Sequence, residues 1–334
     1  MINFLEETLK GDQINIKSGQ TARLLWSRPA AGVIHFEPKK ATNTSIVISV
    51  GVHGNETAPI EIVSHLVNKL LQDQYPLKIR LLVIIGNLEA MRQGKRYLNI
   101  DMNRLFSGNH QDHPTCYETQ RAQALEKLMK NFYNAAPKHH KQHFDLHTAI
   151  RASHHTRFGL LPYKQDGCYH TDMLAWLNYI GLEALVVNHA PTATFSYFSS
   201  EQCSAVSCTL ELGKAHPFND NNLQAFIDIE RGLINLIAAQ PCPAPPKSKL
   251  QVYQVTDVLT KSSDRYELHV DDKVKNFTPF KKGFSFASDN GINHPSQDQI
   301  SYILFPNKQV KVGFRTGLVL KKISLSQLTS ESLH

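Results

Sequence analysis

Apolar runs and amphipathic stretches alternate along the first two thirds of the chain. The apolar runs are short and nearly continuous, which is typical of strands buried on both faces of a sheet. They cover residues 45–50, 79–86, 144–147, 184–188 and 206–212. Stretches with helical periodicity lie between them, at residues 58–71, 117–132, 171–179 and 219–238. This alternation predicts an α/β fold in which helices cover both faces of a sheet.

A different pattern begins after residue 240. Residues 241–246 contain four prolines, which cannot continue a helix and indicate a stiff linker. Beyond them, short strand-like segments are separated by turn residues, at 250–255, 266–270, 283–287, 300–305 and 317–320. We therefore predict a large α/β domain over residues 1–240, which includes a β-like N-terminal segment, and a smaller all-β module over residues 247–334.

The charge of the chain suggests the kind of partner. The 334 residues carry a formal net charge of +7, and the basic residues are scattered rather than gathered on one helix or tract. Scattered charge argues against nucleic acid and is consistent with an anionic small-molecule substrate drawn into a positive cleft. A surface that is basic without any such role is the alternative.

The sequence also limits where the protein is expected. The apolar runs are far too short to cross a bilayer, so we expect no membrane association. The N-terminus lacks the basic flank and long apolar stretch of a signal peptide. The five cysteines are odd in number and lack the spacing of a metal finger. We therefore expect a cytoplasmic protein with reduced thiols. The pattern contains no signal for an oligomeric state.

Four side chains of metal-binding or acid–base type stand at the ends of predicted strands. His53 and Glu56 come directly after one apolar run, and His147 and Glu211 end two others. In an open α/β sheet, ligands bind outside the carboxyl ends of the strands. We therefore expect these four side chains to lie at one edge of the sheet and to form a single site.

His53 and Glu56 stand three residues apart, a spacing at which an imidazole and a carboxylate can share one metal ion. With His147 as third ligand, the set matches catalytic zinc, which often takes two histidines and one glutamate and leaves a fourth position for water. We predict one zinc ion per subunit on these residues. Considered alone, His147 is more typical of a packed core histidine. Asp145 is expected on the opposite face of the strand, where a structural role is as plausible as one in orienting the His147 ring.

Glu211 is predicted to be the general base and acid of a hydrolytic reaction. Zinc lowers the pKa of a bound water to about 7. A carboxylate beside that water can take its proton and pass it to a leaving nitrogen. An ion pair with Lys214 is the alternative interpretation. We favour catalysis because an unpaired glutamate within so apolar a strand is costly to bury.

The loop after the apolar run at 79–86 supplies candidate substrate contacts on the same edge. Arg96 is predicted to polarise the scissile carbonyl and to stabilise the oxyanion. Arg104 offers a planar fork suited to a substrate carboxylate, and Asn103 stands beside it. On their own, two arginines on a loop more often form a solvated surface.

Four ordered motifs resemble the succinylglutamate desuccinylase/aspartoacylase family, a branch of the zinc carboxypeptidase fold. They are His-Gly-Asn-Glu at 53–56, Asp-Met-Asn-Arg-Leu-Phe at 101–106, Asp-Leu-His-Thr at 145–148 and Thr-Leu-Glu-Leu-Gly-Lys at 209–214. The resemblance implies a zinc-carboxypeptidase-like mixed sheet with a β-rich C-terminal module. It also implies the same roles for the three metal ligands, for Glu211, and for Arg96, Asn103 and Arg104.

The reaction implied by the resemblance is the hydrolysis of N2-succinyl-L-glutamate to succinate and L-glutamate, the last step of the arginine succinyltransferase route of arginine breakdown. Three carboxylates on such a substrate agree with the basic charge of the chain. Arg151 and Arg157 are candidates for holding the succinyl end.

Other functions stay open at this point. The same zinc chemistry could act on another N-acyl amino acid, such as N-acetylaspartate, or on a peptide C-terminus, and the shape of the acyl pocket would separate these substrates. A zinc-binding protein without catalysis is less favoured, because a structural zinc site more often closes its fourth position with protein.

Overall fold

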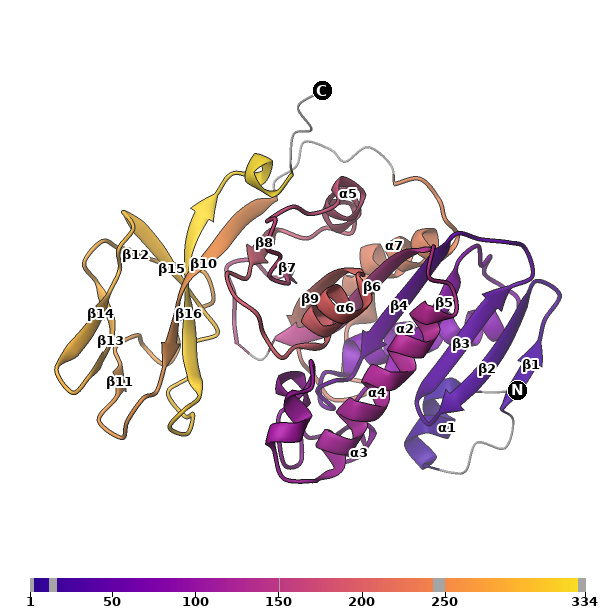
Figure 1. The fold of residues 1–334 in the computed structure, drawn as a ribbon, viewed down its shortest axis with the longest axis horizontal. Coiled ribbons are helices and arrows are strands. Elements are labelled where there is room, and N and C mark those ends of the chain that lie inside the picture. The colour runs from indigo at the N-terminus through magenta and orange to yellow at the C-terminus, as the bar shows by residue number, and fades with distance from the viewer. Residues whose placement is uncertain (1–2, 12–16, 150, 243–249, 330–334) are drawn as a thin grey trace.

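The computed structural model describes residues 3–11, 17–149, 151–242 and 250–329. A broad sheet runs through the molecule, with helices packed against it (Figure 1). The α-helices are α1 (Phe4–Lys10), α2 (Thr57–Leu71), α3 (Leu88–Arg92), α4 (Tyr117–Asn134), α5 (Thr171–Tyr179), α6 (Phe195–Cys203) and α7 (Ile227–Ile237). Short 3-10 helices are η1 (Met102–Arg104), η2 (Asn109–Asp112), η3 (Leu223–Phe226) and η4 (Leu325–Leu328). The strands are β1 (Ser18–Gln20), β2 (Leu24–Ala30), β3 (Val33–Pro38), β4 (Thr44–Val50), β5 (Arg80–Ile85), β6 (His140–Ala149), β7 (Phe158–Leu161), β8 (Ala184–Val187), β9 (Val206–Lys214), β10 (Gln251–Thr260), β11 (Glu267–Leu268), β12 (Thr278–Lys281), β13 (Ser285–Asp289), β14 (Ile292–Pro295), β15 (Ile300–Leu304) and β16 (Arg315–Ile323).

The large sheet has 13 strands in the order β1-β2-β3-β5-β4-β6-β9-β7-β8-β10-β16-β15-β12. The central strands β5, β4, β6 and β9 run parallel, whereas β3 and β7 flank them in the antiparallel direction. The sheet is therefore mixed, as predicted. Because β5, β4, β6 and β9 are parallel neighbours, their carboxyl ends meet at one edge of the sheet.

Alternate residues of β4 pack into different cores. Ile46, Ile48 and Val50 belong to a cluster that also contains residues of α1, α2, α3, α5 and α7. Val47 belongs to a second cluster, with residues of α4 and α6. Successive side chains of a strand point to opposite faces, so helices cover both faces here. That burial on both sides is the reason for the nearly continuous apolar runs.

The five predicted strands of the α/β part are present as β4, β5, β6, β8 and β9, and the predicted helices correspond to α2, α4, α5 and α7. Several short elements were not predicted, and α6 shows why. Its sequence is rich in serine and aromatic residues, which are only moderate helix formers. The Thr194 side chain caps the helix by accepting from the backbone nitrogen of Tyr197, and Phe195 and Phe198 are buried in the core. Tertiary packing therefore determines this helix.

Strand β6 begins four residues earlier than predicted, inside a polar stretch. His143 in this stretch is fully buried between neighbouring elements. Its Nε2 lies 2.8 Å from the hydroxyl of Ser49 on β4, and its Nδ1 lies 2.7 Å from the hydroxyl of Ser199 on α6. A polar residue whose hydrogen bonds are satisfied inside the protein can occupy a buried strand.

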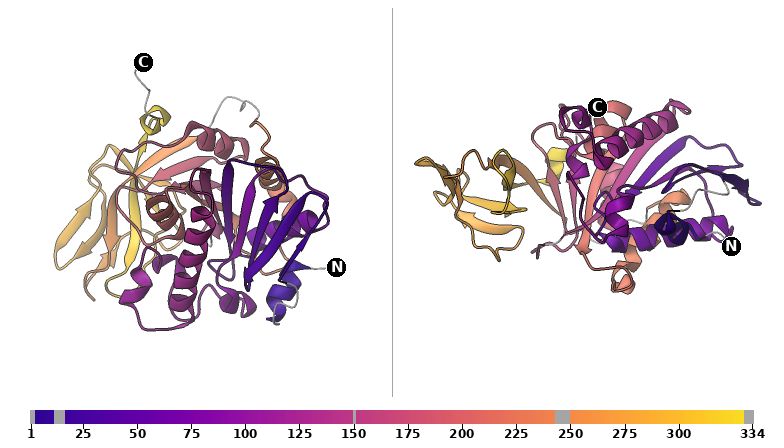
Figure 2. Two further views of the ribbon diagram at one scale, coloured as in Figure 1. Left: turned by 45° about the vertical axis from the view of Figure 1, so that its right-hand side comes forward. Right: turned by 90° about the horizontal axis from the view of Figure 1, so that it is seen from below.

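The C-terminal segments are rich in β-strands, as predicted. Strands β10, β16, β15 and β12 continue the large sheet through the parallel pair of β8 and β10, and β11, β13 and β14 form a separate antiparallel sheet. These orange and yellow strands lie at the end of the molecule remote from the indigo strands β1–β3 (Figures 1 and 2). The domain boundaries at 240 and 247 stay a prediction, since residues 243–249 lie outside the described residues. No helix in the described part of the chain is both long and apolar enough to span a membrane.

Candidate functional site

A tight loop between β4 and α2 positions the first two candidate ligands. Gly51 ends the strand with a φ of 62°, in the left-handed region that favours glycine. Gly54 packs so closely on α3 that an added Cβ atom would stand 2.2 Å from the backbone nitrogen of Met91. This loop brings His53 and Glu56 to the carboxyl edge of the sheet, where both side chains are buried.

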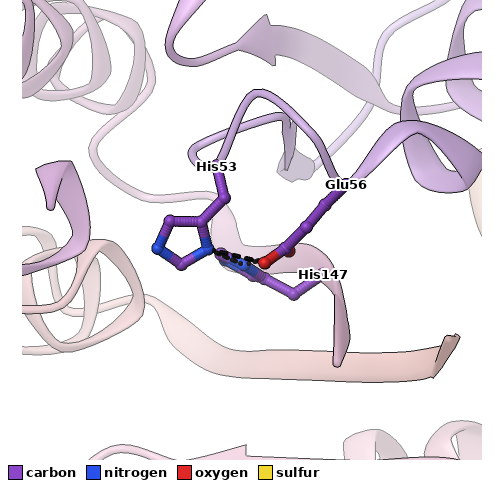
Figure 3. Close-up of side chains that lie close together, drawn as sticks. All are labelled: His53, Glu56 and His147. Carbon is purple, nitrogen blue, oxygen red and sulfur yellow. Dashed lines mark hydrogen bonds and ion pairs between the residues drawn. The ribbon is translucent and has the colours of Figure 1, made fainter. Parts of the chain in front are cut away.

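His53, Glu56 and His147 form one buried cluster (Figure 3). Glu56 Oε1 lies 2.9 Å from His53 Nδ1, and Glu56 Oε2 lies 2.9 Å from His147 Nδ1. The two Nδ1 atoms are 3.2 Å apart. One donor atom from each side chain lies within 4.8 Å of the other two. The structure thus brings together the three residues that we predicted as zinc ligands.

The outer ring nitrogen of each histidine faces a carboxylate. His53 Nε2 lies 2.9 Å from Asp101 Oδ1, and His147 Nε2 lies 2.8 Å from Asp145 Oδ2. When Nε2 carries the proton and donates it to the carboxylate, the lone pair of each Nδ1 is available. Both lone pairs then point toward the same space beside Glu56. Carboxylates in this position are typical partners of metal-binding histidines.

Sequence reasoning was wrong about the face of Asp145 and gave Asp101 no role. Residues two apart in a strand share a face, so Asp145 lies on the same side of β6 as His147 and orients its ring. Asp101 contacts His53 across 48 residues of chain. The motif at 101–106 contains this aspartate, but only the fold shows which histidine it holds.

The buried charges of the cluster stabilise one another. Burial raises the pKa of Glu56, but the charges of His53 and His147 outweigh burial, so its pKa lies far below the usual value. Burial lowers the pKa of His147, whereas Asp145 and Glu56 raise it well above its usual value. Burial raises the pKa of Asp101, but the charges of His53, Arg104 and Arg96, together with the hydrogen bond to His53, bring it well below its usual value.

These residues fit a zinc ion. Two imidazoles and one carboxylate are the protein ligands of many catalytic zinc sites. The backbone nitrogen of Thr148 donates to Glu56 Oε2 at 3.0 Å, which holds the carboxylate in place. With both histidine tautomers set by the outer carboxylates, the donor atoms are preorganised for a cation.

Glu211 lies at the carboxyl end of β9, directly opposite His147 of β6 in the strand register. Its Oε2 atom is buried and has no hydrogen-bond partner among the described residues. Burial raises the pKa of Glu211 to about 7, and the charge of Glu56 adds to that shift while His147 opposes it. A carboxyl group that titrates near neutral pH is suited to exchanging protons.

The alternative role for Glu211, an ion pair with Lys214, is not supported. Lys214 is exposed at the end of β9, and no ion pair between the two side chains occurs in the described part of the chain. The buried Glu211 carboxyl group therefore lacks the compensation that a structural ion pair would provide.

Arg96 reaches the cluster from the loop that follows α3. Its Nη1 donates to Glu56 Oε1 at 2.8 Å, and its Nη2 lies 3.7 Å from Asp101 Oδ2. Burial lowers the pKa of Arg96, but the charges of Glu56 and Asp101 raise it above its usual value. The guanidinium group therefore stands, fully charged, beside the candidate metal ligands.

Asn103 and Arg104 belong to η1 on the same edge. The Asn103 amide oxygen accepts from the backbone nitrogen of Phe195 at 3.0 Å, which leaves its amino group for other acceptors. Arg104 Nη1 donates to the carbonyl oxygen of Asn103 at 2.8 Å. Within the described residues, Arg104 forms no ion pair. Its guanidinium group therefore keeps donors for an external carboxylate.

The two other arginines considered for the acyl end are held elsewhere. Arg151 Nη1 donates to the carbonyl oxygens of Asp272 and Val274, at 2.7 and 2.8 Å. Arg157 donates to the carbonyl oxygen of Ala225. Both guanidinium groups therefore tie loops together.

The chain matches a family model described as the succinylglutamate desuccinylase/aspartoacylase catalytic domain over residues 42–237. The chain belongs to the succinylglutamate desuccinylase/aspartoacylase family. A second family model, the AstE/AspA barrel-sandwich hybrid domain, matches residues 248–323.

Relatives within this family extend the likeness to nearly the whole chain. A succinylglutamate desuccinylase from Yersinia pestis is 43% identical over 328 residues, which is 98% of this chain and 99% of the relative. The crystal structure of the succinylglutamate desuccinylase from Chromobacterium violaceum has a TM-score of 0.85 and 37% identity, covering 97% of this chain and 98% of that one. The X-ray structure of the Vibrio parahaemolyticus protein of the same name has a TM-score of 0.88 and 30% identity, covering 96% and 95%. The family resemblance and the fold class predicted from the sequence are confirmed.

Proposed function

We propose that this family member hydrolyses N2-succinyl-L-glutamate to succinate and L-glutamate, with one zinc ion held by His53, Glu56 and His147. The observation that carries the proposal is the partly buried Glu211, whose buried Oε2 atom has no hydrogen-bond partner among the described residues and which stands beside a preorganised set of candidate metal ligands. Relatives named succinylglutamate desuccinylase, at 43% and 37% identity over nearly the full chain, support the choice of substrate.

The residues divide the chemistry among them. A bound zinc ion supplies a Lewis acid that polarises the amide carbonyl and acidifies water. Glu211 accepts a proton from the attacking water and delivers it to the departing amide nitrogen, so that the C–N bond breaks to give a carboxylate and an amine. Arg96 donates hydrogen bonds to the carbonyl oxygen as negative charge develops on it.

The amino-acid part of the substrate is assigned to η1. Arg104 binds the α-carboxylate through its planar fork, and the Asn103 amino group donates to the same carboxylate. Support for this assignment comes from the missing acidic partner of Arg104 among the described residues. We also propose that the enzyme acts in the cytoplasm, at the last step of the arginine succinyltransferase route.

An N-acetylated amino acid is the alternative substrate, because the family model also carries the name aspartoacylase. The direct test is release of free amino acid by the zinc-loaded protein from N2-succinyl-L-glutamate, with N-acetyl-L-aspartate in parallel. We expect rapid release from the succinyl compound and little from the acetyl compound. The reverse order would replace the proposed substrate, and release from neither would refute the activity.

The role of Glu211 is tested by the substitution Glu211→Gln, which keeps the shape of the side chain and removes the base. We expect kcat to fall by about 10²–10⁴-fold, while zinc content measured by atomic absorption stays at one ion per chain. Glu201→Gln is the matched control, since Glu201 is an exposed residue of α6. Wild-type kcat in Glu211→Gln would contradict the proposed mechanism.

A further inference from the structure

A second arginine without an acidic partner among the described residues belongs to the C-terminal strands. Arg315 begins β16 and is partly buried. Its Cζ atom lies 5.9 Å from the ring centroid of Phe305, a cation–π contact that positions the guanidinium group without using its N–H donors. In the described part of the chain, the Arg315 side chain has no ion pair and no hydrogen bond. Its donors are therefore available to an external acceptor.

Aromatic contacts connect Arg315 to the edge of the sheet that carries the active site. The Phe305 ring lies 5.9 Å from the ring of Phe158. Phe158 of β7 is the register partner of Glu211 on β9. The backbone nitrogen of Phe305 also donates to Asn276, at 2.8 Å. A series of aromatic contacts thus leads from Arg315 through Phe305 to Phe158, the register neighbour of the proposed general base.

Residues 152–154, a few positions after His147, bind the same asparagine, Asn276, that accepts from the backbone of Phe305. The backbone nitrogen of Asn276 donates to the carbonyl oxygen of Ala152 at 2.9 Å, and the nitrogen of His154 donates to the carbonyl oxygen of Asn276 at 3.1 Å. Asn276 is fully buried at this junction. Backbone hydrogen bonds through Asn276 therefore hold Phe305, the ring on which Arg315 packs, against the segment that follows β6.

The charges of the site act on Arg315. Burial, the charge of Arg104 and, to a smaller extent, the charge of Arg96 lower the pKa of Arg315 to about 9, against the opposing charge of Asp101. Arg315 is therefore coupled more strongly to Arg104 than to Arg96. Two guanidinium groups without acidic partners repel each other, and an anion bound between them removes that repulsion.

We propose that Arg315 binds the side-chain carboxylate of the glutamate moiety and makes the enzyme specific for an acidic amino acid. This inference rests on the proposed function. Arg104 is assigned to the α-carboxylate and Arg96 to the scissile carbonyl, so a residue coupled mainly to Arg104 lies on the amino-acid side of the scissile bond. The substrate carries a second carboxylate on that side, and a guanidinium fork suits its geometry.

The proposal is tested by removing the arginine and the carboxylate separately and together. Arg315→Met is compared with wild type on three substrates: N2-succinyl-L-glutamate, N2-succinyl-L-glutamine, and glutamate acylated with succinamic acid, which lacks the succinyl carboxylate. We expect Arg315→Met to lower kcat/KM by about 10²-fold on both glutamate compounds. On the glutamine compound the loss is expected to be only a few-fold, because the contact is already missing there.

Controls separate a specific contact from a general loss of structure. Arg265→Met removes an exposed arginine from the same C-terminal part and is expected to leave all three kcat/KM values unchanged. Arg315→Lys keeps the charge and should recover part of the activity on the glutamate compounds. Calorimetry supplies a readout without turnover: wild type should bind L-glutamate more tightly than L-glutamine, and Arg315→Met should bind both alike.

Each outcome decides one point. Equal losses on all three substrates would make Arg315 a structural residue and overturn the proposal. A loss that spares only the succinamic acid compound would place Arg315 at the succinyl end instead. If wild type releases no amino acid from any of the three substrates, the proposed function fails. If wild type turns over these substrates, but the loss of kcat/KM in Arg315→Met does not differ between the glutamate and glutamine compounds, only the role of Arg315 is refuted.

Discussion

A chain of buried polar residues connects to the cluster of His53, Glu56 and His147. Asp145 orients His147, and the Ser49 hydroxyl donates to Asp145 Oδ1 at 2.5 Å. The same hydroxyl contacts His143, whose other ring nitrogen contacts Ser199. These contacts connect β4, β6 and α6 beneath the site. A neutral His143 satisfies them without placing a second positive charge near His147.

This network predicts a stability that depends on pH. Burial lowers the pKa of His143 to about 4, against 6.5 when exposed; Asp145 opposes the shift and His147 adds to it. Between these pH values His143 binds more protons in the unfolded chain than in the folded protein, so the contribution of His143 to the free energy of unfolding falls as the pH falls from 6.5 toward 4. The full loss is about 3 kcal/mol. Urea unfolding of metal-free protein at several pH values measures it.

The matched variant for this measurement is His143→Gln, whose amide retains hydrogen-bonding groups but does not titrate. As the pH falls from 6.5 to 4, we expect the free energy of unfolding of His143→Gln to fall less than that of wild type, because only wild type carries the His143 contribution. Parallel curves for the two proteins would show that His143 does not carry the acid sensitivity.

At the level of elements, the junction of β4, α2 and α3 determines where two of the ligands stand. Helix α3 begins at an Asn87 cap whose side chain accepts from the backbone nitrogen of Ala90. The backbone of this short helix packs against Gly54, between His53 and Glu56. The close approach permits no side chain at position 54, so the spacing of the ligands depends on helix packing as well as on the motif.

Gly54→Ala should therefore affect folding and metal binding together. The new Cβ would meet backbone atoms of Ala90 and Met91 at 2.3 and 2.2 Å, so α3 or the ligand loop must move. We expect a destabilisation of about 1–3 kcal/mol and weaker zinc binding. Urea unfolding and zinc titration measure the two effects.

Gly94→Ala is the control for the loss of glycine flexibility. Gly94 has a φ of 60°, but an added Cβ would meet no atom within 4 Å. We expect a strain of about 1–2 kcal/mol with unchanged zinc affinity. Wild-type zinc affinity in Gly54→Ala would show that the close packing on α3 does not position the ligands.

On the scale of the whole molecule, one continuous sheet links the site to the C-terminal strands. Strand β10 pairs with β8 in parallel, and β8 connects through β7 to β9, the strand that carries Glu211. Any ligand that stabilises the edge of β6 and β9 therefore stabilises the sheet to which the C-terminal strands belong. A zinc ion that binds only the folded chain must raise the stability of the fold by linkage.

Removal of the metal is expected to lower the melting temperature by several degrees. When free zinc exceeds its dissociation constant by about a thousandfold, binding adds about 4 kcal/mol to the free energy of unfolding. Differential scanning calorimetry with and without a chelator measures the shift. Glu211→Gln should keep the zinc-dependent shift, because Glu211 is not a ligand. His147→Gln should lose most of it, and an unchanged shift in His147→Gln would refute the ligand assignment.

The sequence by itself determined the features that depend on neighbouring residues. Buried strands and amphipathic helices follow from local periodicity, and the His53–Glu56 pair follows from a three-residue spacing at the end of a strand. The three ligands, Glu211 and Arg96 were all predicted to share one edge, because parallel strands present their carboxyl ends together.

Only the tertiary structure decided the contacts between distant segments. Asp101 orients His53, the polar half of β6 is buried against Ser49 and Ser199, and Arg315 of the last strand packs on the ring of Phe305. Such contacts depend on strand order, register and helix packing, which are set by the whole buried core rather than by any local pattern. A single sequence therefore indicates which side chains can perform the chemistry, and the fold decides which of them meet.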